Sequence, residues 1–378
     1  MSEIIIKEVS TKKDLKRFIE FNYDLYRGNE YAVPELYMDL KNTFTRGKNA
    51  SLEFCDFQLF MAYRDGKAVG RIAAIINNRA NEIWKTKNVR FGWIDFIDDI
   101  EVSRKLIDTV KEWGRQRGME ELQGPLGFVD FDREGMLIEG FDKIATMATH
   151  YNYPYYPEHM ERLGLEKATD WADRLVMTPD KMPEKYARIA DIAAKRSKLH
   201  IKKLESMKEV NEGGYGRKIF ELINESYAPL FGFSRLDDNQ IKQVVASYLP
   251  MVDLRMQTLI ENEEGELVGV GLAMPSIVHA LQKSGGKLFP FGWWHLIKAL
   301  KWKHEDMVEL LLVAVRPDYQ GKGVNALLFN DLIPIYREMG FKGAETNLQL
   351  EDNYQSAAQW DYLNPTVPKR YRCYHMKL

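Results

Sequence analysis

The clearest chemical signature in this sequence lies near the C-terminus, where a buried strand, a glycine-rich loop and a helix follow one another. Leu310 to Val315 is an unbroken apolar run of strand length, and Pro317 ends it because proline cannot continue a ladder of backbone hydrogen bonds. Gln320 to Gly323 then leads into apolar residues spaced for the buried face of a helix. Free backbone N–H groups and the helix dipole favour an anion at such a turn. The stretch therefore predicts a site for a phosphate-bearing ligand.

The composition limits the classes of protein to which this chain can belong. A length of 378 residues allows roughly two domains, and a hydrophobic content of 45% is enough for packed cores. The net charge of −2 provides no basic field of the kind that binds nucleic acid, so no nucleic-acid partner is expected. Cys55 and Cys373 are the only cysteines and lie far apart, which predicts reduced, packed thiols and no metal site.

Targeting and membrane signals are not visible. The first residues, MSEIIIKEVSTKKDLK, contain no apolar core followed by a cleavage site. No apolar run approaches the roughly 20 residues that a transmembrane helix needs. The default expectation is a soluble cytoplasmic protein.

Hydrophobic periodicity and turn residues predict an α/β chain of the mixed-sheet, α+β kind. Helices are expected at Lys12 to Tyr26, Glu35 to Leu40, Glu101 to Arg117, Pro157 to Leu163, Lys185 to Ala194, Tyr215 to Tyr227, Asp237 to Tyr248 and Asn353 to Tyr362. Strands are expected at Ile4 to Val9, Phe57 to Tyr63, Ala68 to Ile76, Val89 to Ile97, Leu122 to Phe128, Asp170 to Thr178, His200 to Leu204, Arg255 to Glu261, Leu267 to Pro275, Leu310 to Val315, Gly343 to Leu350 and Tyr371 to Lys377.

The order of these elements repeats along the chain. Each half reads as strand, helices, hairpin, strand, helix, strand, helix and strand, although the residues themselves repeat little. Two tandem copies of one fold explain this order better than one large domain does. We therefore expect domains at residues 1–181 and 182–378.

The stretch VAVRPDYQGKGV resembles the main motif of the GNAT superfamily of N-acetyltransferases. The resemblance implies two tandem GNAT-like acyltransferase folds and an acetyl-CoA or other acyl-CoA co-substrate. The loop would bind the CoA pyrophosphate through its N–H groups, with Lys322 either near a phosphate or solvated. The strand backbone and Asn353 would contact the pantetheine arm. The implied cofactor-binding residues are Val313, Ala314, Val315, Gln320, Gly321, Lys322, Gly323, Val324, Asn325 and Asn353.

Two positions depart from the family pattern. Asn325 stands where Gly or Ala is usual, and Trp360 stands where many members carry a tyrosine that protonates the leaving thiolate. Trp360 closes the later motif of Asn353, Ser356 and an aromatic residue, but its indole is no acid. Tyr362, two residues on, is the substitute candidate.

The first half resembles a degenerate copy that lacks the phosphate loop. DDIEVS stands between the corresponding strand and helix and contains no glycine, whereas Tyr155-Tyr156 and Leu163-Gly164-Leu165 resemble the closing signature of the family. Tandem copies with one cofactor site resemble the peptidoglycan-bridge aminoacyltransferases, N-myristoyltransferase and mycothiol synthase. The stretches GPLGF, YYP and QGKGV resemble uncharacterised bacterial acetyltransferase-like proteins.

Three alternatives remain open at this point. Residues 321–326 also match the dinucleotide pattern G-x-G-x-x-G/A, with Glu345 roughly 20 residues on, but Pro317 to Tyr319 separate the strand from the glycines. Asn325 and Trp360 are also compatible with a non-catalytic ligand- or protein-binding module. Phe289 to Lys303 could lie on a membrane surface, hold a long acyl chain, or be a buried helix or dimer contact.

If the chain is an acyltransferase, the resemblance implies direct attack of an amine on the thioester, with a small-molecule or peptide amine as the acceptor. Glu309, at the start of the strand, is the first candidate for the general base, ahead of Glu345 and Glu351. The long segment at residues 130–157 mixes acidic and aromatic residues, and such loops are often functional. Its candidates for acceptor binding are Asp130, Asp132, Arg133, Glu134 and Tyr156. A homodimer is also compatible with the sequence.

Overall fold

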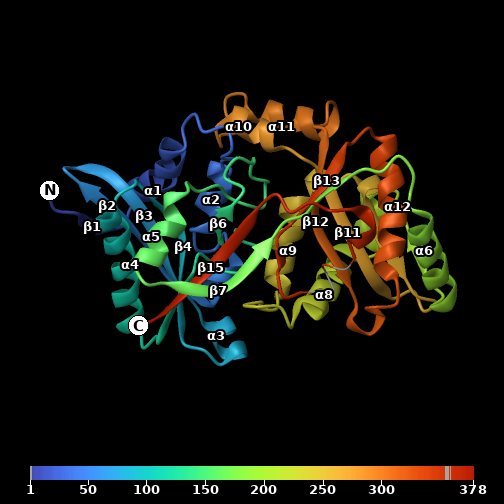
Figure 1. Ribbon diagram of the computed structural model, residues 1–378, viewed down its shortest axis with the longest axis horizontal. Coiled ribbons are helices and arrows are strands. Elements are labelled where there is room, and N and C mark those ends of the chain that lie inside the picture. The colour runs from blue at the N-terminus through green and yellow to red at the C-terminus, as the bar shows by residue number, and fades with distance from the viewer. Residues whose placement is uncertain (1, 354–356, 358) are drawn as a thin grey trace. The chain divides into compact units, whose positions relative to one another are not determined.

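The computed structural model describes residues 2–353, 357 and 359–378. The chain forms two compact units, each built around one β-sheet (Figure 1). Unit 1 comprises Met1–Ala172, Val278–His295 and Lys369–Leu378, and unit 2 comprises Asp173–Ile277 and Leu296–Pro368. The predicted domain boundary between residues 181 and 182 lies inside the first segment of unit 2.

The sheet of unit 1 has the order β1-β2-β3-β4-β5-β15-β7, and β6 also pairs with β15. Only the β4–β5 pair of this sheet is parallel among the described residues. The strands are β1 (Ile5–Glu8), β2 (Cys55–Arg64), β3 (Lys67–Asn77), β4 (Asn88–Phe96), β5 (Glu121–Gly124), β6 (Met136–Glu139), β7 (Glu166–Ala172) and β15 (Arg370–Lys377). The helices are α1 (Lys12–Leu25), α2 (Tyr37–Thr43), α3 (Asn78–Trp84), α4 (Ile100–Arg115), α5 (Tyr155–Arg162) and α10 (Val278–Ser284).

Strand β3 is buried on both faces, which explains the apolar run from Ile72 to Ile76. Ile72 and Ala74 belong to the core cluster that contains the apolar face of α4, whereas Ala73 and Ile75 belong to the cluster under α1. Helix α1 begins as predicted at Thr11, whose side chain accepts from the N–H of Asp14 in a reciprocal capping box. Cys55 and Cys373 are both buried free thiols.

The sheet of unit 2 has the order β9-β10-β11-β12-β13-β8, in which only β12 and β13 are parallel among the described residues. The strands are β8 (Leu175–Met177), β9 (His200–Lys202), β10 (Gln257–Glu261), β11 (Leu267–Pro275), β12 (Met307–Val315) and β13 (Gly343–Thr346). The short strand β14 (Gln349–Leu350) is not part of this sheet. The helices are α6 (Glu184–Arg196), α7 (Met207–Glu212), α8 (Tyr215–Tyr227), α9 (Asp238–Tyr248) and α12 (Val324–Glu338); α11 (Gly292–Lys301) contains the division between the two units.

Helix α12 packs closely on the unit 2 sheet because two glycines of β11 leave room for it. A Cβ atom on Gly271 would lie 3.1 Å from the Cδ1 atom of Leu332, and one on Gly269 would lie 2.9 Å from the Cγ1 atom of Val324. Helices α6 and α12 lie side by side on the sheet (Figure 1). The close approach holds the N-terminus of α12 beside the end of β12, where the glycine loop joins them.

The two sheets share one pattern, as expected for tandem copies of one fold. In each, four antiparallel strands lead to a parallel pair, and an antiparallel strand follows on the far side. The two strands in this last position are exchanged between the units: each follows strands of one unit in the sequence but pairs in the sheet of the other. Strand β8, which comes directly after β7, pairs with β13 in unit 2, whereas β15 near the C-terminus pairs with β5 and β7 in unit 1.

Two predicted elements differ from the structure for this reason. The strand predicted at Asp170 to Thr178 is two strands, β7 and β8, which belong to different sheets. The last predicted strand, Tyr371 to Lys377, exists but belongs to unit 1.

The predicted helix from Asn353 to Tyr362 includes residues 354–356 and 358, Ser356 among them, which lie outside the described residues. Within the described part of the chain, no helix has the length and apolar character needed to cross a membrane.

Candidate active site

Strand β12 has a strand neighbour along its whole length on one side only, among the described residues. β11 pairs with it from Val308 to Val315, whereas β13 pairs with it only from Met307 to Leu310. A register shift in the pairing with β11 leaves Leu311 as an extra residue, a β-bulge that separates the two parts of the strand. The last residues of β12 therefore have an edge that no other described strand covers.

Two hydroxyl groups of helix α8 bind carbonyl oxygens at this edge. The hydroxyl of Tyr227 donates to the carbonyl oxygen of Val313 at 3.1 Å. The hydroxyl of Ser226 lies 3.0 Å from the carbonyl oxygen of Val315 and 2.8 Å from that of Leu222. Burial raises the pKa of Tyr227 to about 12, so this phenol keeps its proton at neutral pH.

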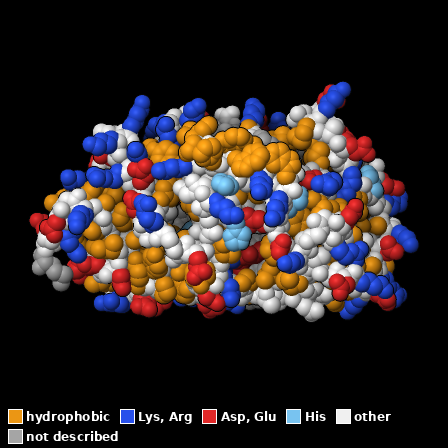
Figure 2. Space-filling model, turned by 90° about the horizontal axis from the view of Figure 1, so that it is seen from above, with side chains coloured by type: hydrophobic (Ala, Val, Ile, Leu, Met, Phe, Trp, Pro, Cys, Tyr) orange, Lys and Arg blue, Asp and Glu red, His pale blue; other side chains and the backbone are white. Residues whose placement is uncertain are grey.

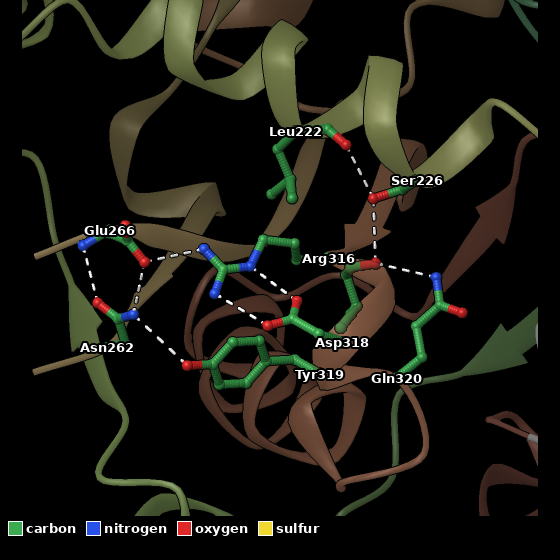
Figure 3. Close-up of polar contacts among 9 residues, drawn as sticks. Leu222, Ser226, Asn262, Glu266, Arg316, Asp318, Tyr319 and Gln320 are labelled. Atoms are coloured by element: carbon green, nitrogen blue, oxygen red, sulfur yellow. Dashed lines mark hydrogen bonds and ion pairs between the residues drawn. The ribbon is translucent and has the colours of Figure 1, made fainter. Parts of the chain in front are cut away.

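The turn after β12 is held by a network of charged and polar side chains (Figure 3). Arg316 binds both carboxylate oxygens of Asp318, at 2.8 and 3.0 Å, and also donates to Glu266 at 3.0 Å. The Arg316 guanidinium holds the pKa of both carboxyl groups below their usual values. Asn262 joins Glu266 to the hydroxyl of Tyr319. The side chain of Gln320 closes the turn by donating to the carbonyl oxygen of Val315 at 3.0 Å.

The glycine loop has the conformation that its residues favour. Gly321 and Gly323 have φ angles of +70° and +84°, a region that L-residues with side chains rarely adopt. A Cβ atom at Gly323 would lie 3.1 Å from the Cβ atom of Ala193 in α6, whereas one at Gly321 would meet nothing within 4 Å. Gly323 is therefore fixed by packing, and Gly321 lies at an open surface.

Helix α12 presents its N-terminus at this loop without a side-chain cap. Gly323 is its N-cap residue, and the N–H of Ala326 already donates to the carbonyl oxygen of Gly323 at 3.0 Å. The N–H groups of Val324 and Asn325 therefore remain as the first ones without a partner within the helix. In unit 1 the corresponding terminus, at α4, is capped by the carboxylate of Asp99, which accepts from the N–H of Glu101 and pairs with Arg64. An anion would therefore meet a negative charge at α4 and a free helix terminus at α12.

Three other loop residues have clear positions. Val324 is buried in the core, and the ammonium of Lys322 lies 5.1 Å from the ring centroid of Tyr319. The Oδ1 atom of Asn325 is buried and has no hydrogen-bond partner among the described residues. Asn325 thus presents an unpaired acceptor within the first turn of α12, and its amide group also carries two N–H donors.

The predicted cofactor residues divide by the direction of their backbone groups. Val313 and Val315 direct theirs to the open edge of β12, as the hydroxyl contacts indicate. Ala314 alternates with them and lies opposite Val270 of β11. The backbone carbonyl oxygen of Asn353 accepts from the N–H of Ala357 at 3.0 Å. The residues from Val313 to Asn325 are thus brought together at one end of unit 2 and fit a diphosphate at the loop.

The predicted base, Glu309, is buried on β12 and accepts from the hydroxyl of Ser276 at 3.1 Å. Glu345 lies opposite Glu309 on β13, so two of the three candidates for the general base are neighbours on adjacent strands. Glu351 follows β14 and is partly buried.

Trp360 and Tyr362 occupy different environments. Trp360 is a core residue whose ring packs on Phe329 at 4.6 Å and whose indole N–H donates to Gln349. Tyr362 is exposed, with the ammonium of Lys185 over its ring at 4.5 Å and the ring of Tyr186 at 6.1 Å.

The phenol that the structure places at the β12 edge is Tyr227, which the sequence analysis did not single out. A hydroxyl-bearing residue at the end of the predicted helix from Tyr215 to Tyr227 was the only available signal.

The predicted acceptor-binding residues all lie in unit 1 and have partners there. The carboxylate of Asp132 accepts from the N–H groups of Phe128 and Val129, while burial raises its pKa to about 6. Arg133 donates to the carbonyl oxygens of Val33 and Met147. Burial, and secondly the neighbouring charge of Asp130, raises the pKa of Glu134 well above its usual value.

Tyr156 belongs to a buried network around Asp95. The hydroxyl of Tyr156 donates to Asp95 and accepts from the N–H of Phe96. Asp95 also accepts from Nε of Arg71 at 2.7 Å and from Nδ2 of Asn22 at 3.0 Å. These contacts give Asp132, Arg133 and Tyr156 structural roles; whether they also bind an acceptor remains a prediction.

Comparison with known proteins agrees with this geometry. Residues 217–358 match the family model described as Acetyltransferase (GNAT) family. The chain is 26% identical to Protein YghO of Escherichia coli (strain K12), over 99% of this chain and 95% of the relative. It is also 26% identical to the Bacterial ceramide synthase of Caulobacter vibrioides (strain NA1000 / CB15N), over 100% of this chain and 98% of the relative.

A solved structure resembles the whole fold. The tandem GNAT protein from the clavulanic acid biosynthesis pathway superposes with a TM-score of 0.57 over 99% of this chain and 98% of that one, at 11% sequence identity. Residues 217–358 therefore match the model of the acetyltransferase (GNAT) family, and the whole chain shares the fold of a tandem GNAT protein.

Proposed function

We propose that this chain is an acyl-CoA-dependent N-acyltransferase whose reaction takes place in unit 2. The observation that carries the proposal is the uncapped N-terminus of α12, joined by the glycine loop to the open edge of β12. A diphosphate would accept from the loop and helix N–H groups, and a pantetheine arm would lie along the strand edge. Because the hydroxyls of Tyr227 and Ser226 already bind carbonyl oxygens there, the backbone N–H groups of Val313 and Val315 are the remaining groups at that edge.

The reaction forms an amide and releases a thiol. The amine nitrogen attacks the thioester carbonyl carbon, the C–S bond breaks, and the sulfur leaves with the electron pair. One proton must leave the amine and one must reach the sulfur. We assign the first role to Glu309, which is buried beside Ser276 and Glu345. For the second role we prefer Tyr227 to Tyr362, because Tyr227 lies at the β12 edge and its pKa favours the protonated phenol.

The acyl group and the acceptor are inferred from the loop and from one relative. The resemblance of the loop implies acetyl transfer, whereas the name of the ceramide synthase relative favours a longer acyl chain and a lipid amine. A ceramide is an N-acylated amino alcohol, so both readings share amide formation on an amine. Amide formation on an amine is therefore the proposed reaction, and the acyl length is varied in the test.

We further propose that unit 1 is a copy of the fold without a phosphate site. The Asp99 carboxylate at the N-terminus of α4 supports this, because it supplies the negative charge that a phosphate would otherwise supply. In this view the cofactor residues belong to the second half alone. The segment that contains Asp130 to Glu134 remains the candidate for acceptor recognition.

Two measurements test the proposal. Calorimetry with CoA should give one site for each chain, and incubation with acetyl-CoA or long-chain acyl-CoA and a panel of amines should release free thiol with formation of an amide detected by mass spectrometry. CoA binding without transfer to any amine would favour the non-catalytic binding module. The absence of CoA binding would refute the assignment of the loop.

A further inference from the structure

Helix α11 exposes three large apolar residues and buries two small ones, while Leu296 and Leu300 are half-buried. Gly292 and Ala299 face inward, whereas Trp293, Trp294 and Ile297 are exposed. Phe289 and Phe291, in the loop before the helix, are 80% and 72% exposed, and Trp302 after it is 64% exposed. Figure 2 shows apolar side chains gathered on the face that carries α10 and α11. A helix that packed only against its own protein would show the opposite distribution.

The loop before the helix holds its two phenylalanines in a compact turn. The backbone N–H of Trp293 donates to the carbonyl oxygen of Leu288, and its indole N–H donates to the carbonyl oxygen of Pro290. A Cβ atom on Gly292 would lie 1.8 Å from the carbonyl oxygen of Lys287, so only glycine fits there. The exposed rings are therefore presented by an ordered turn.

The charges of this segment have one sign. Lysines stand at positions 283, 287, 298, 301 and 303, and no Asp or Glu occurs between Glu266 and Glu305. Lys298 and Lys301 follow Trp294 and Ile297 by four residues, so they share the exposed face of α11. The chain as a whole has a net charge of −2, so this positive charge is local.

We propose that residues 287–303, which we call the aromatic–lysine segment, bind the surface of an anionic lipid bilayer. Phe and Trp side chains enter the boundary between head groups and acyl chains, where the indole N–H can still reach a polar partner. Lysines on the same face extend their ammonium groups to the lipid phosphates. This chemistry describes a helix that lies on a membrane surface, and it is independent of whether unit 2 transfers an acyl group.

The charge pattern favours a bilayer over a second copy of this chain. A symmetric contact between two copies of the segment would bring like-charged lysines together, which is unfavourable. An anionic surface instead meets both the apolar and the positive side chains. A dimer through this face is the outcome that would overturn the proposal.

The test uses the full chain without CoA. Cosedimentation is measured with vesicles of phosphatidylglycerol and phosphatidylcholine, and with vesicles of phosphatidylcholine alone, while tryptophan emission reports on burial of the rings. We expect binding to the anionic vesicles, weaker at high salt, with a blue shift of the emission. The double variant Phe289→Ser/Phe291→Ser should bind at least about 10-fold more weakly, because two apolar anchors are lost.

Matched variants separate the two contributions. Lys298→Glu should weaken binding to anionic vesicles about 30-fold, since it changes the local charge by two units. Ile83→Ser removes an apolar residue that is 50% exposed on α3 and should leave vesicle binding unchanged. Equal binding of the double variant and the wild type would overturn the proposal, as would a dimer in sedimentation that the double variant dissociates. CoA calorimetry on the same variants should stay unchanged, so the failure of either proposal can be recognised separately.

Discussion

A negative charge introduced at Gly321 provides the sharpest test of the loop. Gly321 has a positive φ angle, and a side chain there would meet no atom within 4 Å of its Cβ. Replacement by glutamate therefore adds a carboxylate beside the N-terminus of α12 without disturbing the packing. Gly323→Glu is a poorer probe, because its Cβ atom would crowd Ala193 and Ile189 of α6.

The expected size of the effect follows from Coulomb's law. A carboxylate about 6 Å from one phosphate charge, at an effective dielectric constant of about 40, costs roughly 1.4 kcal/mol, which is about 10-fold in affinity. A diphosphate carries two such charges, so we expect Gly321→Glu to weaken CoA binding by about 100-fold. The positive φ angle itself should cost about 1 kcal/mol of stability for any side chain.

Controls at both ends of the helix isolate the charge. Gly321→Gln has the same backbone cost without the charge and should change CoA affinity by less than about threefold. Gly340, after the C-terminus of α12, also has a positive φ angle and open space around its Cβ position. Gly340→Glu and Gly340→Gln should bind CoA like the wild type. The assay is calorimetry with CoA at low and high salt, and equal affinities for the Glu and Gln variants at Gly321 would refute the anion site.

Four further predictions concern catalysis and stability. Glu309→Gln should lower turnover by about 10²-fold or more with unchanged CoA affinity, measured by thiol release, and normal turnover would remove its role as the base. Tyr227→Phe should lower turnover at saturating acyl-CoA, whereas Tyr362→Phe should not; the reverse result would assign the acid to Tyr362. Asp95→Asn should destabilise unit 1 by about 3–5 kcal/mol in chemical denaturation because it leaves a buried guanidinium without its counter-charge, and a loss below about 1 kcal/mol would contradict that account. Burial lowers the pKa of His159 despite its contact with Asp98, so the folded state favours the neutral imidazole. The stability that this preference contributes should be lost as the pH falls below about 6.5. A His159→Gln variant should therefore lose less folding stability than the wild type between about pH 7.5 and 5.

Local signals account for most of the elements that the sequence predicted. Helix α8 begins and ends at the predicted residues Tyr215 and Tyr227, and the hairpin of β2 and β3 surrounds the predicted Asp65-Gly66 turn. Both depend on periodicity and turn chemistry within a short window. The assignment of β8 and β15 to sheets could not be made in this way, because a strand sequence does not state its partner and these two pair across long sequence separations.

The candidate site shows the same difference between features that follow from local sequence and features that depend on distant parts of the chain. The glycine loop was predictable, because its φ angles follow from the glycines themselves. The hydroxyls of Ser226 and Tyr227 at the β12 edge were not, because they come from a helix about 90 residues earlier and their direction depends on how α8 packs. The exposure of the aromatic residues in α11 was also open, since periodicity alone does not tell a buried face from an exposed one.

The exchanged strand has a consequence for how this protein is made. β15 completes the unit 1 sheet between β5 and β7, yet it leaves the ribosome roughly 200 residues after Ala172. At about 5–20 residues per second, the nascent chain carries two uncovered strand edges for roughly 10–40 s while unit 2 is synthesised. Unit 1 therefore cannot finish folding during its own translation, and a chain interrupted at any point before β15 would leave both edges open to aggregation.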